Sequence, residues 1–257
     1  MKIATFNANS IRARLDITLD WLAENEPDVL AIQEIKCEND KFPLDSFEEA
    51  GWQVAIHGQK SYNGVALVSR SPLQNVRMGF EDPTWPDDCR IISATYNGVH
   101  IVNTYVPNGT AVGTDKFDYK LRWLPRFGQL IRERYRPDEK VLWLGDINIA
   151  PTELDVFDAP KHAGKVGFHP REIEELALLT AWGWQDLFRK FVAEGGHYSF
   201  WEFVIPRSVE RNLGWRIDHI YATPPLVDAC TSCIIDKAPR LLERPSDHTF
   251  VVAEFNV

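Results

Sequence analysis

The segment VLWLGDINIAP, residues 141–151, constrains the fold more than any other part of the chain. Its first four residues form a continuous apolar run, which predicts a strand buried on both faces or a piece of core helix. Gly145 ends the run, and Asp146 and Asn148 follow one residue apart, so both side chains point to one side if the strand continues. The alternative is an ordinary turn closed by Pro151, because Gly, Asp and Asn favour turns. The choice depends on whether other predicted strands also end in polar residues.

The first part of the chain predicts a strand, a helix and a second strand that do so. Residues 2–8 form the first strand, which ends near Asn7, and residues 28–33 form the second, which ends at Glu34. Ser10 is expected to cap the helix between them. A strand–helix–strand unit favours a parallel pair, so Asn7 and Glu34 are expected at one carboxyl edge. Open α/β sheets bind their ligands at that edge.

Hairpins accompany this parallel unit farther along the chain. Asn97 and Gly98 lie between two apolar runs, which is a strong hairpin signal, and the second run ends at Tyr105. The longest helical pattern covers residues 116–134, where Pro125 predicts a kink or an interruption. Later strands are expected at residues 199–204, 215–222, 229–236 and 249–255. This mixture predicts an α/β fold with two packed mixed β-sheets flanked by helices, in a single domain over residues 1–257.

Composition limits the classes of function. The chain of 257 residues is 44% hydrophobic and 25% charged, which is typical of a soluble globular protein. No apolar run reaches membrane-spanning length and no signal peptide follows Met1, so we expect a cytoplasmic protein that does not bind membranes. The pair Cys230 and Cys233 has no second pair to complete a zinc site, so the four cysteines are expected to be inert. The formal net charge of -9 argues against binding nucleic acid by bulk charge, but local basic faces remain possible.

Polar residues of a particular kind gather at the predicted strand ends: Asn7, Glu34, Tyr105, Asp146, Asn148, Asp218, Asp247 and His248. Each one alone has an ordinary explanation as a turn, core or strand residue. Together, several carboxylates favour a hard divalent cation, Mg²⁺ or Mn²⁺, over zinc. Such a site beside a histidine suits phosphodiester hydrolysis, since the metal neutralises phosphate charge while other groups prepare a water for attack. The chain has no glycine-rich phosphate loop and no dinucleotide fingerprint.

Six motifs, ordered from residue 6 to residue 251, closely resemble the exonuclease III family of abasic-site endonucleases: FNANSIRARL, IQEIK, NTYVPNG, LGDINIAP, ERNLGWRIDHIYAT and SDHTFV. The resemblance covers essentially the whole chain. It implies the DNase I-like four-layer α/β sandwich of the endonuclease/exonuclease/phosphatase superfamily. It also implies a Mg²⁺- or Mn²⁺-dependent monomer that cuts double-stranded DNA 5′ to abasic sites and trims 3′ ends.

The resemblance further implies roles for single residues. The metal would be bound or approached by Asn7, Glu34, Asp146, Asn148, Asp247 and His248. Asp146 would position or deprotonate the attacking water, helped by Asn148. Tyr105 would contact the phosphate or the leaving oxygen. His248 would contact the scissile phosphate and be oriented by Asp218, a pairing that fixes one tautomer of the imidazole.

Some substrate contacts follow from the same resemblance. Phe200, Trp215 and Ile217 match the family's pocket for a flipped-out sugar without a base, although core aromatic residues would give the same pattern. Clusters of basic residues, rather than the resemblance, indicate local faces for phosphate, and contacts to the DNA backbone are expected from Arg12, Arg14, Lys120 and Arg211, together with Asn63. Ala111 and Val204 stand where animal members carry an Arg and a Met that wedge into the duplex, so strong product retention is not expected.

Three alternatives stay open from the sequence. The enzyme could be a less selective DNase, or a phosphatase acting on another phosphorylated substrate. A catalytically silent DNA-binding module is the third, although such a module has no need for the full set of polar residues at the strand ends.

Overall fold

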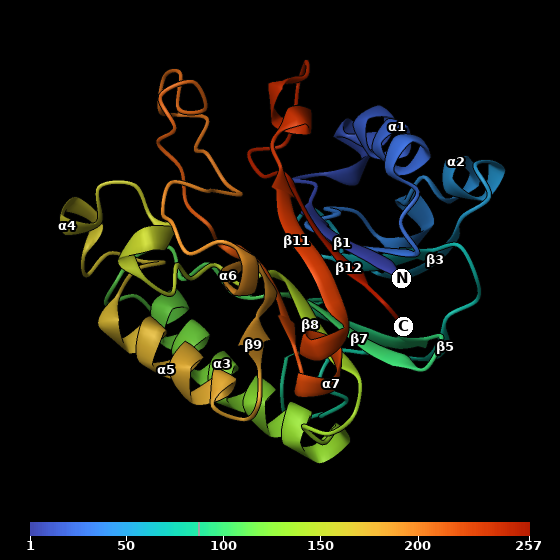
Figure 1. The fold of residues 1–257 in the computed structure, drawn as a ribbon, viewed down its shortest axis with the longest axis horizontal. Coiled ribbons are helices and arrows are strands. Elements are labelled where there is room, and N and C mark those ends of the chain that lie inside the picture. The colour runs from blue at the N-terminus through green and yellow to red at the C-terminus, as the bar shows by residue number, and fades with distance from the viewer. Residues whose placement is uncertain (87) are drawn as a thin grey trace.

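Two six-stranded β-sheets pack face to face in the computed structural model, which describes residues 1–86 and 88–257 (Figure 1). The strand order of the first sheet is β11 (Cys230–Asp236), β12 (Phe250–Phe255), β1 (Lys2–Asn7), β2 (Val29–Gln33), β4 (Val65–Ser69) and β3 (Gln53–His57). The order of the second is β5 (Gln74–Met78), β6 (Ile91–Tyr96), β7 (Val99–Tyr105), β8 (Val141–Asp146), β10 (Asp218–Ala222) and β9 (Gln185–Asp186). Both sheets contain parallel and antiparallel pairs, so the prediction of two mixed sheets is confirmed.

Helices cover the outer faces of the two sheets and complete a four-layer α/β sandwich (Figure 1). The longer ones are α1 (Leu15–Asn25) on the first sheet and α3 (Asp115–Arg134) and α5 (Pro170–Thr180) on the second. The shorter ones are α2 (Leu44–Glu49), α4 (Ala159–His162), α6 (Leu187–Phe191) and α7 (Pro224–Ala229). Short 3₁₀ turns lie at Ile11–Ala13, Asn39–Lys41, Glu153–Asp155 and Ala238–Leu241. Every helix within the two described ranges is too short or too polar to cross a membrane.

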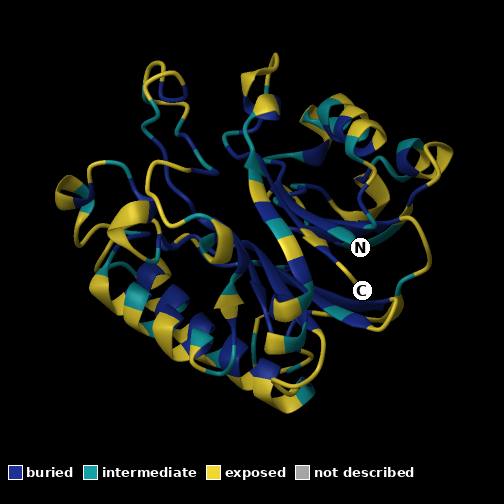
Figure 2. Cartoon of the chain, viewed as in Figure 1, coloured by how far each residue is buried: buried dark blue, intermediate teal, exposed yellow. Residues whose placement is uncertain are grey.

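The central strands are buried on both faces, which explains their unbroken apolar sequences. All six residues of β8 are buried. Leu142 and Leu144 belong to the core between the two sheets, whereas Trp143 belongs to the core beneath α3, where its ring lies 5.0 Å from that of Phe127. Figure 2 shows the same distribution, with buried residues along the sheets and exposed residues on the outer sides of the helices. The apolar run at residues 141–144 is therefore a strand, as the first of the two interpretations predicted.

Two parallel strand pairs place the polar residues that end their strands at one edge of the molecule. β1 pairs with β2, so Asn7 lies beside Gln33, and β7 pairs with β8, so Tyr105 lies beside Asp146. β10 runs antiparallel to β8 and begins with Asp218, opposite Asp146. The carboxyl ends of β1, β2, β7 and β8 and the first residue of β10 consequently meet at one edge.

Two local predictions are wrong. The side chain of Ser10 makes no capping hydrogen bond, and a 3₁₀ turn separates it from α1, which begins at Leu15. The strand expected at residues 199–204 is reduced to isolated bridges from Phe200 to Trp215 and His248, and the strand expected at residues 215–222 begins at Asp218. Turns and a bend cover residues 203–212, from the end of the first expected strand onward, and the Ser208 hydroxyl there donates to the Glu202 carbonyl and so satisfies the backbone locally.

Candidate active site

A pocket of about 270 Å³ opens at the edge where the strands end. Its walls include most of the residues singled out from the sequence: Glu34, Tyr105, Asp146, Asn148, Phe200, Trp215, Ile217, Asp247 and His248. These residues come from both sheets and from segments far apart in the chain. The fold therefore brings the predicted carboxylates, the histidine and the apolar side chains into one cavity.

Asn7 joins the two central carboxylates of this site. It is buried, and its side-chain nitrogen donates to Glu34 Oε1 at 2.9 Å and to Asp146 Oδ2 at 2.8 Å. Its side-chain oxygen accepts from the backbone N–H of Asn9 at 2.9 Å. In this arrangement Asn7 holds the carboxylates in place and turns its own oxygen away from them.

The donor set suits a hard divalent cation. Ligand atoms of Glu34, Asp146 and His248 lie within 4.8 Å of one another. Burial, together with the nearby carboxylates of Asp218 and Glu34, raises the pKa of Asp146 to about 7, whereas the charge of His248 opposes that shift. Carboxylate oxygens that converge in this way are the ligands that hard divalent cations prefer, so the residues present fit a metal ion. The Lys36 ammonium supplies one positive charge, 2.6 Å from Glu34 Oε2.

Backbone conformation at the site is unusual. Glu34 has φ 49° and Asn148 has φ 54°, both in the left-handed region that side chains other than glycine seldom adopt. The strain is compensated at Asn148, whose N–H donates to Asp146 Oδ1 at 2.9 Å. The amide of Asn148 is held at both ends, because it donates to the Val106 carbonyl and accepts from Asn108. That arrangement makes Asn148 a support for Asp146 and gives no support to its predicted role as a metal ligand.

His248 is held between two carboxylates. Its Nδ1 lies 2.8 Å from Asp218 Oδ2, and its Nε2 lies 3.7 Å from Asp146 Oδ2. Burial opposes a charge on the imidazole, but Asp218 and Asp146 outweigh it and raise the pKa of His248 to about 10. The ring is therefore an imidazolium at neutral pH, able to donate from Nε2 into the pocket.

Tyr105 presents a phenol to the same cavity. Burial, together with the carboxylates of Glu34 and Asp146, raises its pKa well above the ordinary value. The Arg90 guanidinium lies 4.8 Å from the centre of its ring. Tyr105 is consequently a neutral hydrogen-bond donor at any physiological pH.

Asp247 reaches the site through Asn9. Its Oδ1 accepts from Asn9 Nδ2 at 2.9 Å, and Asn9 Oδ1 in turn accepts from the Lys36 ammonium. Asp247 lines the pocket but does not belong to the close cluster of Glu34, Asp146 and His248.

The apolar wall of the pocket is formed by Phe200, Trp215 and Ile217. The Phe200 ring lies 4.7 Å from the His248 ring, so this wall borders directly on the catalytic histidine proposed from the sequence. Trp215 and Ile217 are 8% and 6% exposed and also belong to a small core cluster. These side chains both line the cavity and pack in the core.

The residues expected to contact the DNA backbone have different environments. Arg12 and Arg211 are exposed. Arg14 and Asn63 are half-buried and are bonded to backbone carbonyls, Arg14 to those of Asn9 and Pro245 and Asn63 to that of Asp88.

The prediction of a DNA contact at Lys120 is wrong. The side chain is 0% exposed, and its ammonium bonds to the Asn148 carbonyl at 2.8 Å and forms an ion pair with the buried Glu172. It cannot reach a phosphate outside the protein. Its position behind Asn148 makes it a support for the loop that carries Asp146 and Asn148.

Two neighbours of the site were not singled out from the sequence. Lys36 lies inside the motif IQEIK, so its spacing from Glu34 was a usable signal. Asn108, which donates to Asn148 Oδ1 at 3.0 Å, lies in the turn after Tyr105, and only its place in the motif NTYVPNG points to it.

Comparisons with known proteins extend these observations. The sequence pattern of the Endonuclease/Exonuclease/phosphatase family matches residues 4–248. Exodeoxyribonuclease III of Haemophilus influenzae is 32% identical over 268 residues, which cover 99% of this chain and all of that protein. An AP endonuclease from Archaeoglobus fulgidus has a solved structure with a TM-score of 0.97 and 40% identity over 100% of both chains. A 3′ phosphatase from Neisseria, solved with a product DNA hairpin, has a TM-score of 0.94 and 38% identity, again over 100% of both chains.

Proposed function

The chain belongs to the endonuclease/exonuclease/phosphatase family and is a phosphodiester hydrolase, and we propose that it is a Mg²⁺- or Mn²⁺-dependent DNA-repair nuclease that cuts duplex DNA 5′ to abasic sites and trims 3′ ends. One observation carries the proposal. The carboxylates of Glu34 and Asp146 share a single pocket, which has an apolar wall, with His248, and Asp218 holds the imidazole of His248 in place. This combination suits a phosphodiester beside a sugar that lacks its base.

Glu34 and Asp146 are the residues that would hold the divalent cation, with Asp247 near it and Asn7 fixing the two carboxylates. When bound, the cation would neutralise phosphate charge and favour ionisation of a water. Asp146, held by hydrogen bonds from Asn7 and from the backbone N–H of Asn148, would accept the proton of that water.

His248 and Tyr105 would stabilise the phosphate as negative charge develops on it. The imidazolium donates from Nε2, while Asp218 accepts from Nδ1 and so fixes the orientation of the ring. The neutral phenol of Tyr105 donates to a phosphate oxygen or to the leaving oxygen. Both donors are held by the protein before substrate arrives, so little reorganisation is needed during the reaction.

The apolar wall supports selection of abasic sites. A sugar without a base costs less to extrude from the duplex than a complete nucleotide, because no base has to be unstacked. Phe200, Trp215 and Ile217 would receive this sugar beside His248, and the small cavity would exclude a base. The site is complete within one chain, so we propose that the enzyme acts as a monomer.

Processing of 3′ ends is the activity that could instead dominate over incision at abasic sites. The solved relatives that span the whole chain include an AP endonuclease and a 3′ phosphatase, with similar identities of 40% and 38%. Three duplexes assayed with one enzyme preparation and Mg²⁺ would separate the activities: one with a single abasic analogue, its undamaged twin and one with a 3′-phosphate. We expect incision of the first, no internal cutting of the second and release of phosphate from the third. Cleavage of the first two at equal rates would instead indicate an unselective DNase.

A further inference from the structure

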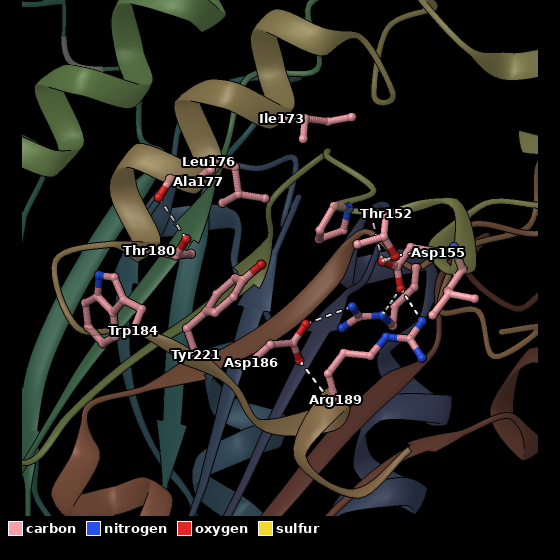
Figure 3. Close-up of a pocket in the computed structure, with 13 residues that line it drawn as sticks. Thr152, Asp155, Ile173, Leu176, Ala177, Thr180, Trp184, Asp186, Arg189 and Tyr221 are labelled. Atoms are coloured by element: carbon pink, nitrogen blue, oxygen red, sulfur yellow. Dashed lines mark hydrogen bonds and ion pairs between the residues drawn. The ribbon is translucent and has the colours of Figure 1, made fainter. Parts of the chain in front are cut away.

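A second pocket, of about 350 Å³, lies between α5 and the segment that carries Thr152 and Asp155 (Figure 3). Trp215 and Ile217 line the active site, whereas Arg216, which lies between them in the chain, lines this second pocket. The two cavities therefore share one extended segment and lie on its opposite sides. Nothing in the proposed reaction uses the second cavity.

The side walls of this pocket are mostly apolar. Ile173, Leu176, Ala177 and Thr180 recur at the spacing of one face of α5 and form one side. Figure 3 shows Thr152 and Asp155 across the cavity from them, on the segment that follows β8. Walls of this kind suit a small apolar molecule.

The floor of the pocket is an ion-pair network without net charge. Asp155 Oδ1 lies 2.7 Å from Arg216 Nε and 2.5 Å from Arg189 Nη2, and Asp186 Oδ2 lies 2.7 Å from Arg216 Nη2. Two positive and two negative side chains are thus paired with one another. Because these four charges balance, a charged ligand would lose its hydration without meeting a net opposite charge, so the pocket favours an uncharged one.

Tyr221 supplies the polar contact that such a ligand needs. The residue is 3% exposed, and its hydroxyl points into the cavity between Leu176 and Thr152 (Figure 3). The hydroxyl has no hydrogen-bond partner in the part of the chain that the structure describes. The hydroxyl faces the open space of the cavity, so an acceptor on a ligand can take its hydrogen bond in place of water.

We propose that this pocket is an effector site for an uncharged ring compound with one hydrogen-bond acceptor, to which the Tyr221 hydroxyl donates. The effect on activity, unlike the binding itself, rests on the proposed function. The coupling path is short: the Arg216 N–H donates to the Asp155 carbonyl at 2.7 Å, and Val156 forms a β-bridge with Trp215. A ligand that contacts Asp155 and Arg216 can therefore shift the segment that forms the wall of the sugar pocket.

Binding is tested without reference to activity, with benzamide as the probe and benzoate as its anionic counterpart. We expect ligand-observed NMR to show saturable binding of benzamide at concentrations up to about 10 mM, because a ligand with so few atoms has a dissociation constant in the millimolar range. Benzoate should bind at least about tenfold more weakly. Tyr221→Phe should weaken benzamide binding about fivefold, the effect of one lost neutral hydrogen bond. Equal binding of benzamide and benzoate would contradict the choice of an uncharged ligand.

A matched pair of variants on α5 locates the site. Ala177→Trp places a large side chain at the mouth of the pocket, whereas Leu178→Trp changes the next residue, which is 63% exposed and does not line the pocket. Benzamide should bind Leu178→Trp as it binds the unmodified protein and should not bind Ala177→Trp. Absence of saturable binding to the unmodified protein, or equal binding to both variants, would overturn the proposal.

The effect on activity is measured last, as incision of an abasic duplex at saturating benzamide. The rate should change at least about twofold in the unmodified enzyme and in Leu178→Trp, but not in Ala177→Trp. Binding without any change in rate would overturn the coupling to the sugar pocket. Absence of incision under all conditions would count against the proposed function and leave the binding result standing.

Discussion

Nδ1 of His248 lies 2.8 Å from a carboxylate oxygen of Asp218, and neither residue is more than 5% exposed. Asp218 begins β10, whereas His248 precedes β12 in the other sheet, so this contact joins the two sheets across the active site. The second oxygen of Asp218 is buried without a hydrogen-bond partner in the described ranges. The pair thus holds a charged imidazole in one orientation, facing Asp146.

Neutralising Asp218 tests this relationship. Asp218→Asn removes the carboxylate that raises the pKa of His248, so less of the imidazole should be charged and its orientation should be less fixed. We expect turnover on an abasic duplex to fall by about two orders of magnitude or more, with little change in DNA binding. His248→Asn should have a similar effect. The exposed Asp138→Asn is the control, and near-normal turnover in both site variants would refute the assignment.

Metal removal tests the carboxylate pair. Excess chelator should abolish cleavage, and Mg²⁺ or Mn²⁺ should restore it, because a buried pair of carboxylates needs a cation to hold a phosphate. Glu34→Gln should need a much higher metal concentration for half-maximal activity than Glu38→Gln, which changes an exposed neighbour. Full activity in the presence of chelator would show that the metal site is wrongly assigned.

The strands that carry the site were predictable because they are buried on both faces and end abruptly in polar residues. Glu34 and Asp146 could be recognised from their positions after such strands. In contrast, β5 was not expected, because all five of its residues are exposed and it has no apolar pattern. An edge strand of this kind is specified by its partner strand, and the sequence does not show that partner.

Lys120 shows a second limit of local sequence patterns. A lysine on an amphipathic helix is normally exposed, and its basic neighbours suggested a DNA-binding face. Its partner Glu172 lies on another helix, and only packing of α3 against α5 reveals that both charges are buried together. Asn7 and Asn148 show the same limit. Their residue type marked them as site residues, but only the hydrogen bonds of their amide groups in the structure show which neighbours they hold.

The buried pair of Lys120 and Glu172 predicts a stability effect. Lys120→Met leaves the Glu172 carboxylate buried without its cation, which should lower the free energy of unfolding by about 3–5 kcal/mol. Combining Lys120→Met with Glu172→Gln removes both charges but keeps an oxygen that accepts from the Gly167 and His169 N–H groups, so it should recover part of that loss. Urea unfolding measures both variants, with Lys116→Met on the exposed side of α3 as the control. Equal stability of the control and the single variant would contradict the buried pair.

Asp186 predicts a loss of stability in acid. Burial opposes its ionisation, but Arg216 and His219 outweigh burial and lower its pKa below the ordinary value. A carboxyl whose pKa is lower in the folded state stabilises the protein above its unfolded pKa of about 4, and this stability is lost as the pH falls toward the folded pKa. Asp186→Asn should therefore reduce the free energy of unfolding at pH 7 more than at pH 3, whereas the exposed Asp16→Asn should show no such difference. An equal loss at both pH values would refute the stabilising charge.

The wall of the sugar pocket predicts how selectivity can be separated from stability. Trp215→Ala should widen the cavity and lower the ratio of abasic-site cutting to cutting of intact duplex by about tenfold or more, because the enlarged pocket no longer excludes a base. It should also lower stability by about 3–5 kcal/mol, since Trp215 is buried. Trp123→Ala removes a buried tryptophan of α3, away from the pocket, and should lower stability by a similar amount without altering the ratio. Melting temperatures and both cleavage rates are measured on the same preparations. If the two variants kept the same ratio as the unmodified enzyme, Trp215 would be a core residue only, and abasic selectivity would have to come from the lower cost of extruding a sugar without a base.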